Sequence, residues 1–402
     1  MALVPNQKGD LVTSEVELQT VLDLTALRGT PTELIGGTSV VLNSSDTVLQ
    51  LGGGAENDPQ RYVAFVTNTG MPVRASYIEK SGVLWPADFH SWNMVTTYYN
   101  FERSYLYFQG IFGDNAATLQ SMPMRVLYWT DARLTLDSPS LVDNAFFHPW
   151  VKSFLIVPFK DLQKVPLAMN LGVIAHETAH RVFNYTALRN EGDPLVLERW
   201  VDWHFNLLKS IDEGFADFHA YGVTCKEPSG CNSTFLEMSL ADRREVAARD
   251  FADPKQCLDG PTRDLFLNTP RDTWVAPGSK MYPIGTLWAA ALFQGAKKAG
   301  SAGAVESVQM ALVAAYDDAT PGKQGLAQLI GSGDVPNNFT MEAVADTILS
   351  HISEKNLRTK VCNELLTRLQ LDCTSDGSVH CQEMPHCPDE SVADATVCPT
   401  IP

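Results

Sequence analysis

Residues 171–180 read LGVIAHETAH, an apolar run that leads directly into an HExxH motif. The run predicts a helix that begins near Ala168, extends through His180 and is buried at its start. Residues four apart lie on the same face of a helix, so the imidazoles of His176 and His180 can reach one ion. Glu177 can then address a water bound to that ion. Chance produces the motif on the order of once per hundred such chains, so its neighbours must support it.

A second segment, SIDEGFAD at residues 210–217, offers the third protein ligand that a catalytic zinc needs beside an open position for water. Glu213 and Asp217 lie four apart on another predicted helix. We predict that Glu213 completes the ligand set with His176 and His180. We expect Asp217 to accept the remaining N–H of a ligand imidazole, which fixes the ring. The alternative is a solvated acidic face, but the apolar neighbours leave little of the segment polar, so buried carboxylates would need partners.

Together these motifs resemble the gluzincins, and within them the thermolysin-like peptidases. HETAH followed by DEGFAD is similar to their HExxH and their downstream Glu-x-x-x-Asp helix, and DNAFF at residues 143–147 resembles their Asn-Ala-aromatic edge strand. The resemblance covers residues 144–292, with the three motifs in the family's order. It implies a zinc metallopeptidase in which Asn144 and Ala145 bind the substrate peptide by strand addition to an exposed sheet edge.

The sequence also departs from the thermolysin-like pattern. From His180 to Glu213 is 33 positions, which implies an inserted segment around residues 190–209. No histidine matches the family's second electrophilic helper. MYPIG at residues 281–285 stands there and is similar to the Tyr-x-x-Gly of the aminopeptidase branch, in which the tyrosine stabilises the oxyanion. Tyr282 is therefore the candidate oxyanion donor, and ordinary packing at a helix start is the alternative.

The residues predict metal-assisted peptide hydrolysis. In this mechanism Glu177 takes a proton from the attacking water and passes it to the leaving amine, while Tyr282 donates to the oxyanion. The aminopeptidase signature Gly-x-Met-Glu-Asn is absent from the sequence, which favours an endopeptidase over an exopeptidase of the same chemistry. A second alternative is a non-enzymatic binding or adhesion protein with a structural metal. Structural zinc normally has four protein ligands, so a fourth ligand would favour that reading.

The order of the expected elements, strands followed by helices, predicts an α+β fold. Residues 1–120 read as a β-rich N-terminal domain, with strands at 61–67 and 104–108. Residues 121–371 are expected to form the catalytic domain, divided into an upper lobe (121–190) with the edge strand and HExxH helix and a helical lobe (191–371). Within it we expect strands at 124–129 and 154–159, and helices at 197–221, 240–251, 284–298, 302–316 and 341–369.

Residues 372–402 read as a cysteine-rich tail. The chain has eight cysteines, five of them from Cys362 to Cys398, among residues that can bury little apolar surface. Disulfides would supply order there and favour a secreted, extracellular or periplasmic location. A metal knuckle is the alternative, but no CxxC pair occurs. Residues 1–10 do not read as a signal peptide, and a mature domain expressed without its leader would look the same.

Composition narrows the choice of partners. The 402-residue chain is 45% hydrophobic and carries a formal net charge of −17. An acidic surface repels phosphate backbones and anionic lipid, which argues against a nucleic-acid or membrane-surface role. No apolar run reaches the length of a transmembrane helix. We expect a peptide or protein substrate and one Zn²⁺; acidic loops such as 250–253 could take Ca²⁺, but no EF-hand spacing is present.

Overall fold

The protein is described by a computed structural model. It covers residues 1–5, 11–42, 65–122, 124–149, 151–160, 165–188, 202–225, 249–251, 257–258, 260–270, 281–317, 322–331 and 339–371. The chain divides into two compact units. Unit 1 comprises residues 1–182 and 219–247, and unit 2 comprises residues 183–218 and 248–402.

The strands in the described part of the chain are all short. They are β1 (Ala2–Pro5), β2 (Leu11–Ser14), β3 (Val21–Asp23), β4 (Arg28–Gly29), β5 (Glu33–Gly36), β6 (Ser39–Val41), β7 (Phe65–Asn68), β8 (Met71–Pro72), β9 (Tyr77–Lys80), β10 (Val83–Pro86), β11 (Arg125–Tyr128), β12 (Asp131–Arg133), β13 (Ala145–His148) and β14 (Ser153–Ile156).

The helices include several of four turns or more. They are α2 (Phe89–Phe112), η2 (Gly113–Asn115), α3 (Ala116–Ser121), η3 (Leu167–Met169), α4 (Leu171–Thr186), α6 (Asp202–Thr224), α8 (Gly260–Asn268), α10 (Met281–Ala299), α11 (Ala304–Tyr316), α12 (Leu326–Ile330), α13 (Met341–His351) and α14 (Lys355–Leu369). None of these described helices is long and apolar enough to cross a membrane.

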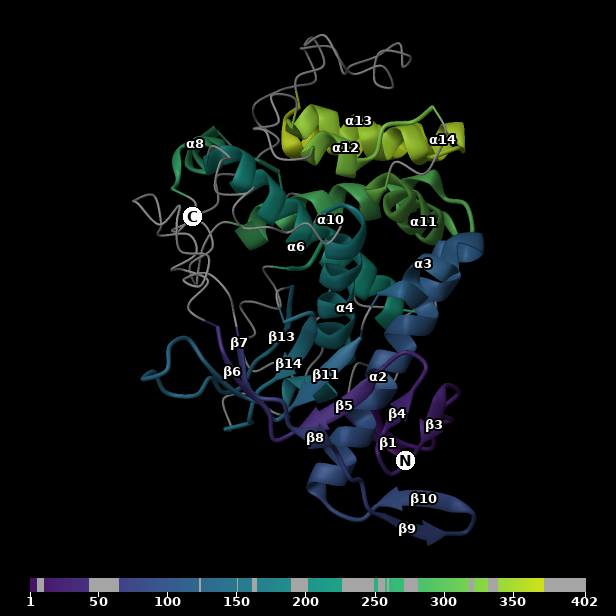
Figure 1. Ribbon diagram of the computed structural model, residues 1–402. Coiled ribbons are helices and arrows are strands. Elements are labelled where there is room, and N and C mark those ends of the chain that lie inside the picture. Colours follow the sequence, from purple (N-terminus) through teal and green to yellow (C-terminus); the bar gives the residue numbers. More distant parts are fainter. Residues whose placement is uncertain are drawn as a thin grey trace. The chain divides into compact units, whose positions relative to one another are not determined.

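Unit 1 is built on a seven-stranded mixed sheet with the order β13-β14-β11-β5-β4-β3, and β8 pairs with β5 (Figure 1). The strands β5, β11 and β14 are parallel, whereas β13 runs antiparallel to β14 and forms the edge. The three parallel strands have apolar side chains buried on both faces, as expected for strands covered on both sides. Leu127, for example, lies beside Ile35 and Leu155 in one buried cluster.

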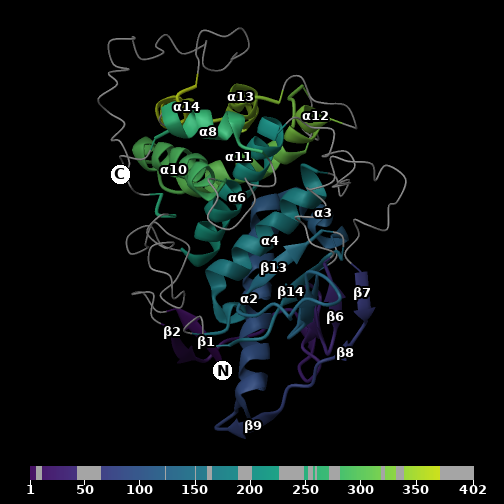
Figure 2. The ribbon, with the colours of Figure 1, turned by 90° about the vertical axis from the view of Figure 1, so that its left-hand side faces the viewer.

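The long helix α2 packs in unit 1 and contains a segment that was expected to be a strand. Residues 104–108 were expected to form a strand, but they lie inside α2, which extends to the β9–β10 hairpin (Figure 2). The aromatic side chains Tyr98, Phe101, Tyr105 and Phe108 are buried at helical spacing, so a period near 3.6 governs the segment. Phe101 packs against Phe154 of β14, with ring centroids 4.6 Å apart.

Unit 2 is helical in its described part. Helix α10 packs against α11 and α14, and α13 packs against α11 and α14 (Figure 1). The expected helix at 341–369 is two helices, because Glu354 caps a new one: its carboxylate accepts from the N–H groups of Asn356 and Leu357. The expected helices at 284–298 and 302–316 are confirmed as α10 and α11.

The chain is a mixed α/β protein, consistent with the expected α+β class. The expected strands at 124–129 and 154–159 are present as β11 and β14. Residues on the two sides of position 120 share one sheet, since β5 pairs with β11 and both belong to unit 1. Residues 240–248 of the expected helix at 240–251, the first part of the strand at 61–67 and the tail at 372–402 lie outside the described residues, and residues 249–251 are not helical.

Candidate metal centre

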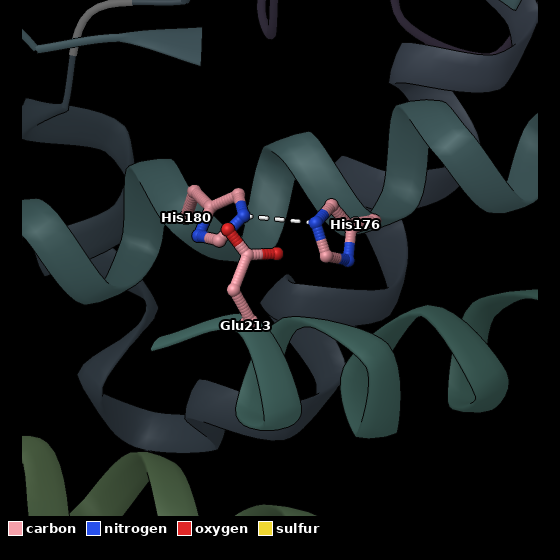
Figure 3. Close-up of side chains that lie close together, drawn as sticks. All are labelled: His176, His180 and Glu213. Carbon is pink, nitrogen blue, oxygen red and sulfur yellow. Dashed lines mark hydrogen bonds between the residues drawn. The ribbon is translucent and has the colours of Figure 1, made fainter. Parts of the chain in front are cut away.

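The HExxH motif lies on α4. Asn170 precedes this helix, and its side-chain oxygen accepts from the N–H of Val173, as in a helix N-cap. The Nε2 atoms of His176 and His180 are 2.9 Å apart, and their rings are nearly perpendicular at 89° (Figure 3). The spacing therefore places both imidazoles on one face, as predicted.

Glu213 on α6 joins the two histidines. One donor atom from each of His176, His180 and Glu213 lies within 4.8 Å of the others, and Figure 3 shows the carboxylate directed toward the imidazoles. Bonds of about 2.0–2.2 Å to zinc require only a small side-chain adjustment from this spacing. Two imidazoles and one carboxylate are the donor set of catalytic zinc sites with an open fourth position. Among the described residues, this group offers three potential ligands and no fourth.

Glu177 is half-buried and contacts the edge strand β13. Its Oε2 accepts a hydrogen bond of 2.8 Å from the backbone N–H of Phe147. The expected edge strand is thus present and lies next to the HExxH helix. Asn144 precedes it and is exposed, and its Oδ1 accepts from the N–H of Ala145 at 2.8 Å. Ala145 is buried.

Arg249, which was not among the residues predicted from the sequence, contacts the carboxylates on α6. Its guanidinium donates to both oxygens of Asp217, with distances of 3.0 and 2.5 Å, and its Nη2 lies 3.8 Å from Glu213 Oε2. All three side chains are buried. Asp217 was expected to accept from a ligand imidazole, which stays a prediction; its carboxylate also accepts from Arg249. No motif marks this arginine, although two buried carboxylates in one turn predict a cation nearby.

The charge of Arg249 is maintained by its partners. Burial alone would lower its pKa, but the charge and hydrogen bonds of Asp217, with a smaller contribution from Glu213, raise the pKa above its ordinary value. Arg249 therefore stays protonated. A bidentate Arg–carboxylate pair fixes both side chains, so Arg249 holds Asp217 in place one helical turn after Glu213.

Tyr282 lies beside this arginine. The guanidinium carbon of Arg249 is 4.6 Å from the centroid of the Tyr282 ring, a cation–π contact. The glycine of the Tyr-x-x-Gly pattern has a packing reason: a Cβ on Gly285 would lie 2.8 Å from the carbonyl oxygen of Ser210 and 2.9 Å from the nitrogen of Gly214. Gly285 thus allows α10 to contact α6 closely beside Glu213, and Tyr282 lies one helical turn before Gly285 on α10.

Two other histidines on α6 do not belong to the ligand group. His219 is fully buried, its Nδ1 is 2.9 Å from the Tyr107 hydroxyl, and burial lowers its pKa to about 3. It is a neutral core residue at neutral pH. His204 is buried against Trp203, with ring centroids 3.6 Å apart, and burial lowers its pKa as well.

The cysteines give partial information. None of the three cysteines in the described ranges (Cys225, Cys257 and Cys362) is a free thiol. The remaining tail cysteines lie outside those ranges, so the cross-linking of the tail stays a prediction.

The chain was also compared with protein families and with curated proteins. No protein-family model matches the chain, and neither does any curated protein.

Proposed function

We propose that the protein is a zinc-dependent endopeptidase of the gluzincin type. The observation that carries the proposal is the convergence of His176, His180 and Glu213 on one potential metal position. Glu177, adjacent to the first ligand in sequence, contacts the strand at the sheet edge. A metal position and a carboxylate base serve metal-assisted peptide hydrolysis, and a strand at a sheet edge can position a peptide beside them.

The metal and the base have separate tasks. When bound, zinc supplies Lewis-acid polarisation of the scissile carbonyl and lowers the pKa of water toward 7. Glu177 takes the proton of the attacking water and delivers it to the leaving amine. Glu177 is the acidic residue of the HExxH motif, and it does not belong to the group formed by His176, His180 and Glu213. A site with a purely structural metal has no need of such a base, which disfavours the binding or adhesion alternative.

Substrate would bind as an added strand. Strand β13 ends the sheet within the described part of the chain, so its outer side can accept an extended peptide. Asn144, exposed at the start of this strand, and Ala145 are the residues that we assign to substrate binding. Tyr282 is the residue that we assign to the oxyanion. Its ring is held against Arg249, which would orient the hydroxyl.

The endopeptidase assignment rests on the missing Gly-x-Met-Glu-Asn signature. Aminopeptidase or other exopeptidase activity is the alternative, and hydrolysis of N-blocked peptides distinguishes the two. An exported protein with a disulfide-linked tail fits the even number of cysteines. We extend the proposal to that location and to peptide or protein substrates.

The decisive experiment combines metal analysis with a protease assay. The purified chain should contain one zinc per molecule and cleave N-blocked peptides, and a chelator should abolish the activity. Glu177→Gln should retain zinc and lose about 10²–10⁴-fold in rate. Glu306→Gln, which alters an exposed glutamate on α11, is the matched control and should leave the rate unchanged. Full activity in Glu177→Gln, or activity without metal, would reject the proposed function.

A further inference from the structure

The outer edge of β13 is already hydrogen-bonded by this chain's own side chains. The N–H of Phe147 donates to Glu177 Oε2, and the N–H of Ala145 donates to Asn144 Oδ1, each at 2.8 Å. Unpaired strand edges invite pairing with other chains. Here the two outward donors are occupied, one by a carboxylate and one by an amide.

The direction of these groups follows from strand geometry. In β13, Phe147 lies opposite Phe154 and Phe146 opposite Leu155. Hydrogen-bonding groups alternate in direction along an antiparallel strand. The N–H of Val157 donates to the carbonyl of Asn144. The backbone N–H and C=O groups of residues 144, 146 and 148 therefore point toward β14, whereas those of residues 145 and 147 point away from the sheet. A peptide that joins this edge meets the backbone of Phe147, and therefore the N–H that Glu177 occupies.

One N–H makes one strong hydrogen bond, so an added strand and Glu177 compete for Phe147. We propose that the backbone N–H of Phe147 holds Glu177 between turnovers, and that a peptide long enough to pair with Phe147 releases it. This inference rests on the proposed function and deepens it. The preferred substrates are extended segments that reach Phe147, and shorter peptides leave the base bound to the strand.

The release is a change of acceptor. The Phe147 N–H donates to a carboxylate before binding and to a peptide carbonyl oxygen afterwards. The carboxylate of Glu177 then turns to the attacking water. Phe147 acts through Glu177 and is a positioning residue. Its side chain has a separate role, since the ring packs on Phe154 with centroids 5.2 Å apart.

The sequence offers a direct probe of this bond. Phe146-Phe147 is the one Phe-Phe pair in the chain. Protein labelled with ¹³C-carbonyl, ¹⁵N-phenylalanine therefore gives a single carbonyl-to-amide correlation peak, that of the Phe147 amide. In the zinc-loaded full chain, Glu177→Ala should speed exchange of this amide with solvent about tenfold, because a charged acceptor is lost. Asn144→Ala is the matched control: it removes the other side chain on the edge and should leave the Phe147 amide unchanged.

Adding peptide to Glu177→Ala, which does not turn over, tests the second half of the proposal. A long N-acetylated peptide should slow the exchange again, and a shorter one of the same core sequence should not. Unchanged exchange in Glu177→Ala, or no protection by any bound peptide, overturns the proposal.

Kinetics provide an independent arm. In wild-type protein, kcat for N-acetylated peptides lengthened one residue at a time around one scissile bond should rise about tenfold at a defined length. Phe147→Pro removes the outward N–H while sparing the bonds to β14, as proline can do at an edge, and should abolish this step. Phe147→Ala keeps the N–H and should retain it. If peptides are cleaved but length has no effect, the inference fails and the peptidase assignment stands; if no peptide is cleaved, the proposed function itself fails.

Discussion

A Cβ atom on Gly214 would lie 2.1 Å from the carbonyl oxygen of Gly285, so α6 and α10 touch backbone to backbone. Both glycines are buried in helices, and the contact leaves no room for a side chain at either position. Since Gly214 follows Glu213 directly, this contact sets the position of the Glu213 carboxylate.

The first prediction concerns this contact. Gly285→Ala should lower the free energy of unfolding by about 1–3 kcal/mol, because the two helices must separate. Urea unfolding measures the change. Gly110→Ala on α2 is the control, since a Cβ there meets no atom within 4 Å, and it should stabilise the chain by about 0.5–1 kcal/mol. Equal effects of the two substitutions would show that the helix contact is not tight.

The second prediction concerns the buried pair of Asp217 and Arg249. Arg249→Met should destabilise the chain by about 3–5 kcal/mol, because it removes a buried cation that lies beside two buried carboxylates. The double variant with Asp217→Leu should cost less than the sum of the single changes, since it also removes one of these charges. Urea unfolding of the four proteins completes the cycle, and strictly additive effects would contradict the coupling.

Zinc binding should stabilise the fold. A thousandfold excess over the dissociation constant contributes about 4 kcal/mol, so zinc should raise the Tm and a chelator should lower it. His180→Ala removes one ligand and should abolish most of the zinc response. His90→Ala, a change at an exposed histidine, should retain it. A zinc-dependent Tm that is unaffected by His180→Ala would place the bound metal elsewhere.

The fourth prediction concerns acid stability. Burial lowers the pKa of His219 to about 3, against about 6.5 in an unfolded chain. Between these pH values the unfolded chain binds a proton that the folded chain does not. The free energy of unfolding should therefore fall as the pH drops below about 6.5, by up to about 1.4 kcal/mol per pH unit.

His219→Gln cannot titrate and should lose this part of the slope, while the exposed His90→Gln should keep it. Urea unfolding at a series of pH values from neutral to about 4 provides the measurement. Identical pH profiles in wild type and His219→Gln would exclude His219 as the source.

Local pattern predicted much of the site. The spacing of His176 and His180 fixes their common face once a helix forms. The strand at DNAFF was expected from the resemblance to the gluzincin edge strand and not from the local pattern. Arg249 could not be predicted, because its contact with Asp217 joins residues 32 positions apart and depends on how helices pack. Glu213 was predicted from its motif, and the distance that brings it to the histidines is a property of the folded chain.

The errors have a physical origin too. Aromatic residues favour strands, and residues 104–108 satisfy that preference, yet burial at spacings of three and four selected helix α2. The break between α13 and α14 depends on a cap at Glu354, a single side chain within an otherwise helical pattern. In both cases the preference of single residues competed with packing or capping, and the latter decided the structure.

The position of β5 governs how the protein can be shortened. Because β5 lies between β11 and β4, its residues occupy the interior of the sheet. A fragment that starts at residue 121 would lack this central strand. The apolar side of β11, with Leu127, would then be open to solvent and to other chains. Such a fragment should be recovered as aggregate, whereas a cut in an exposed turn such as the one between β9 and β10 should leave the sheet intact.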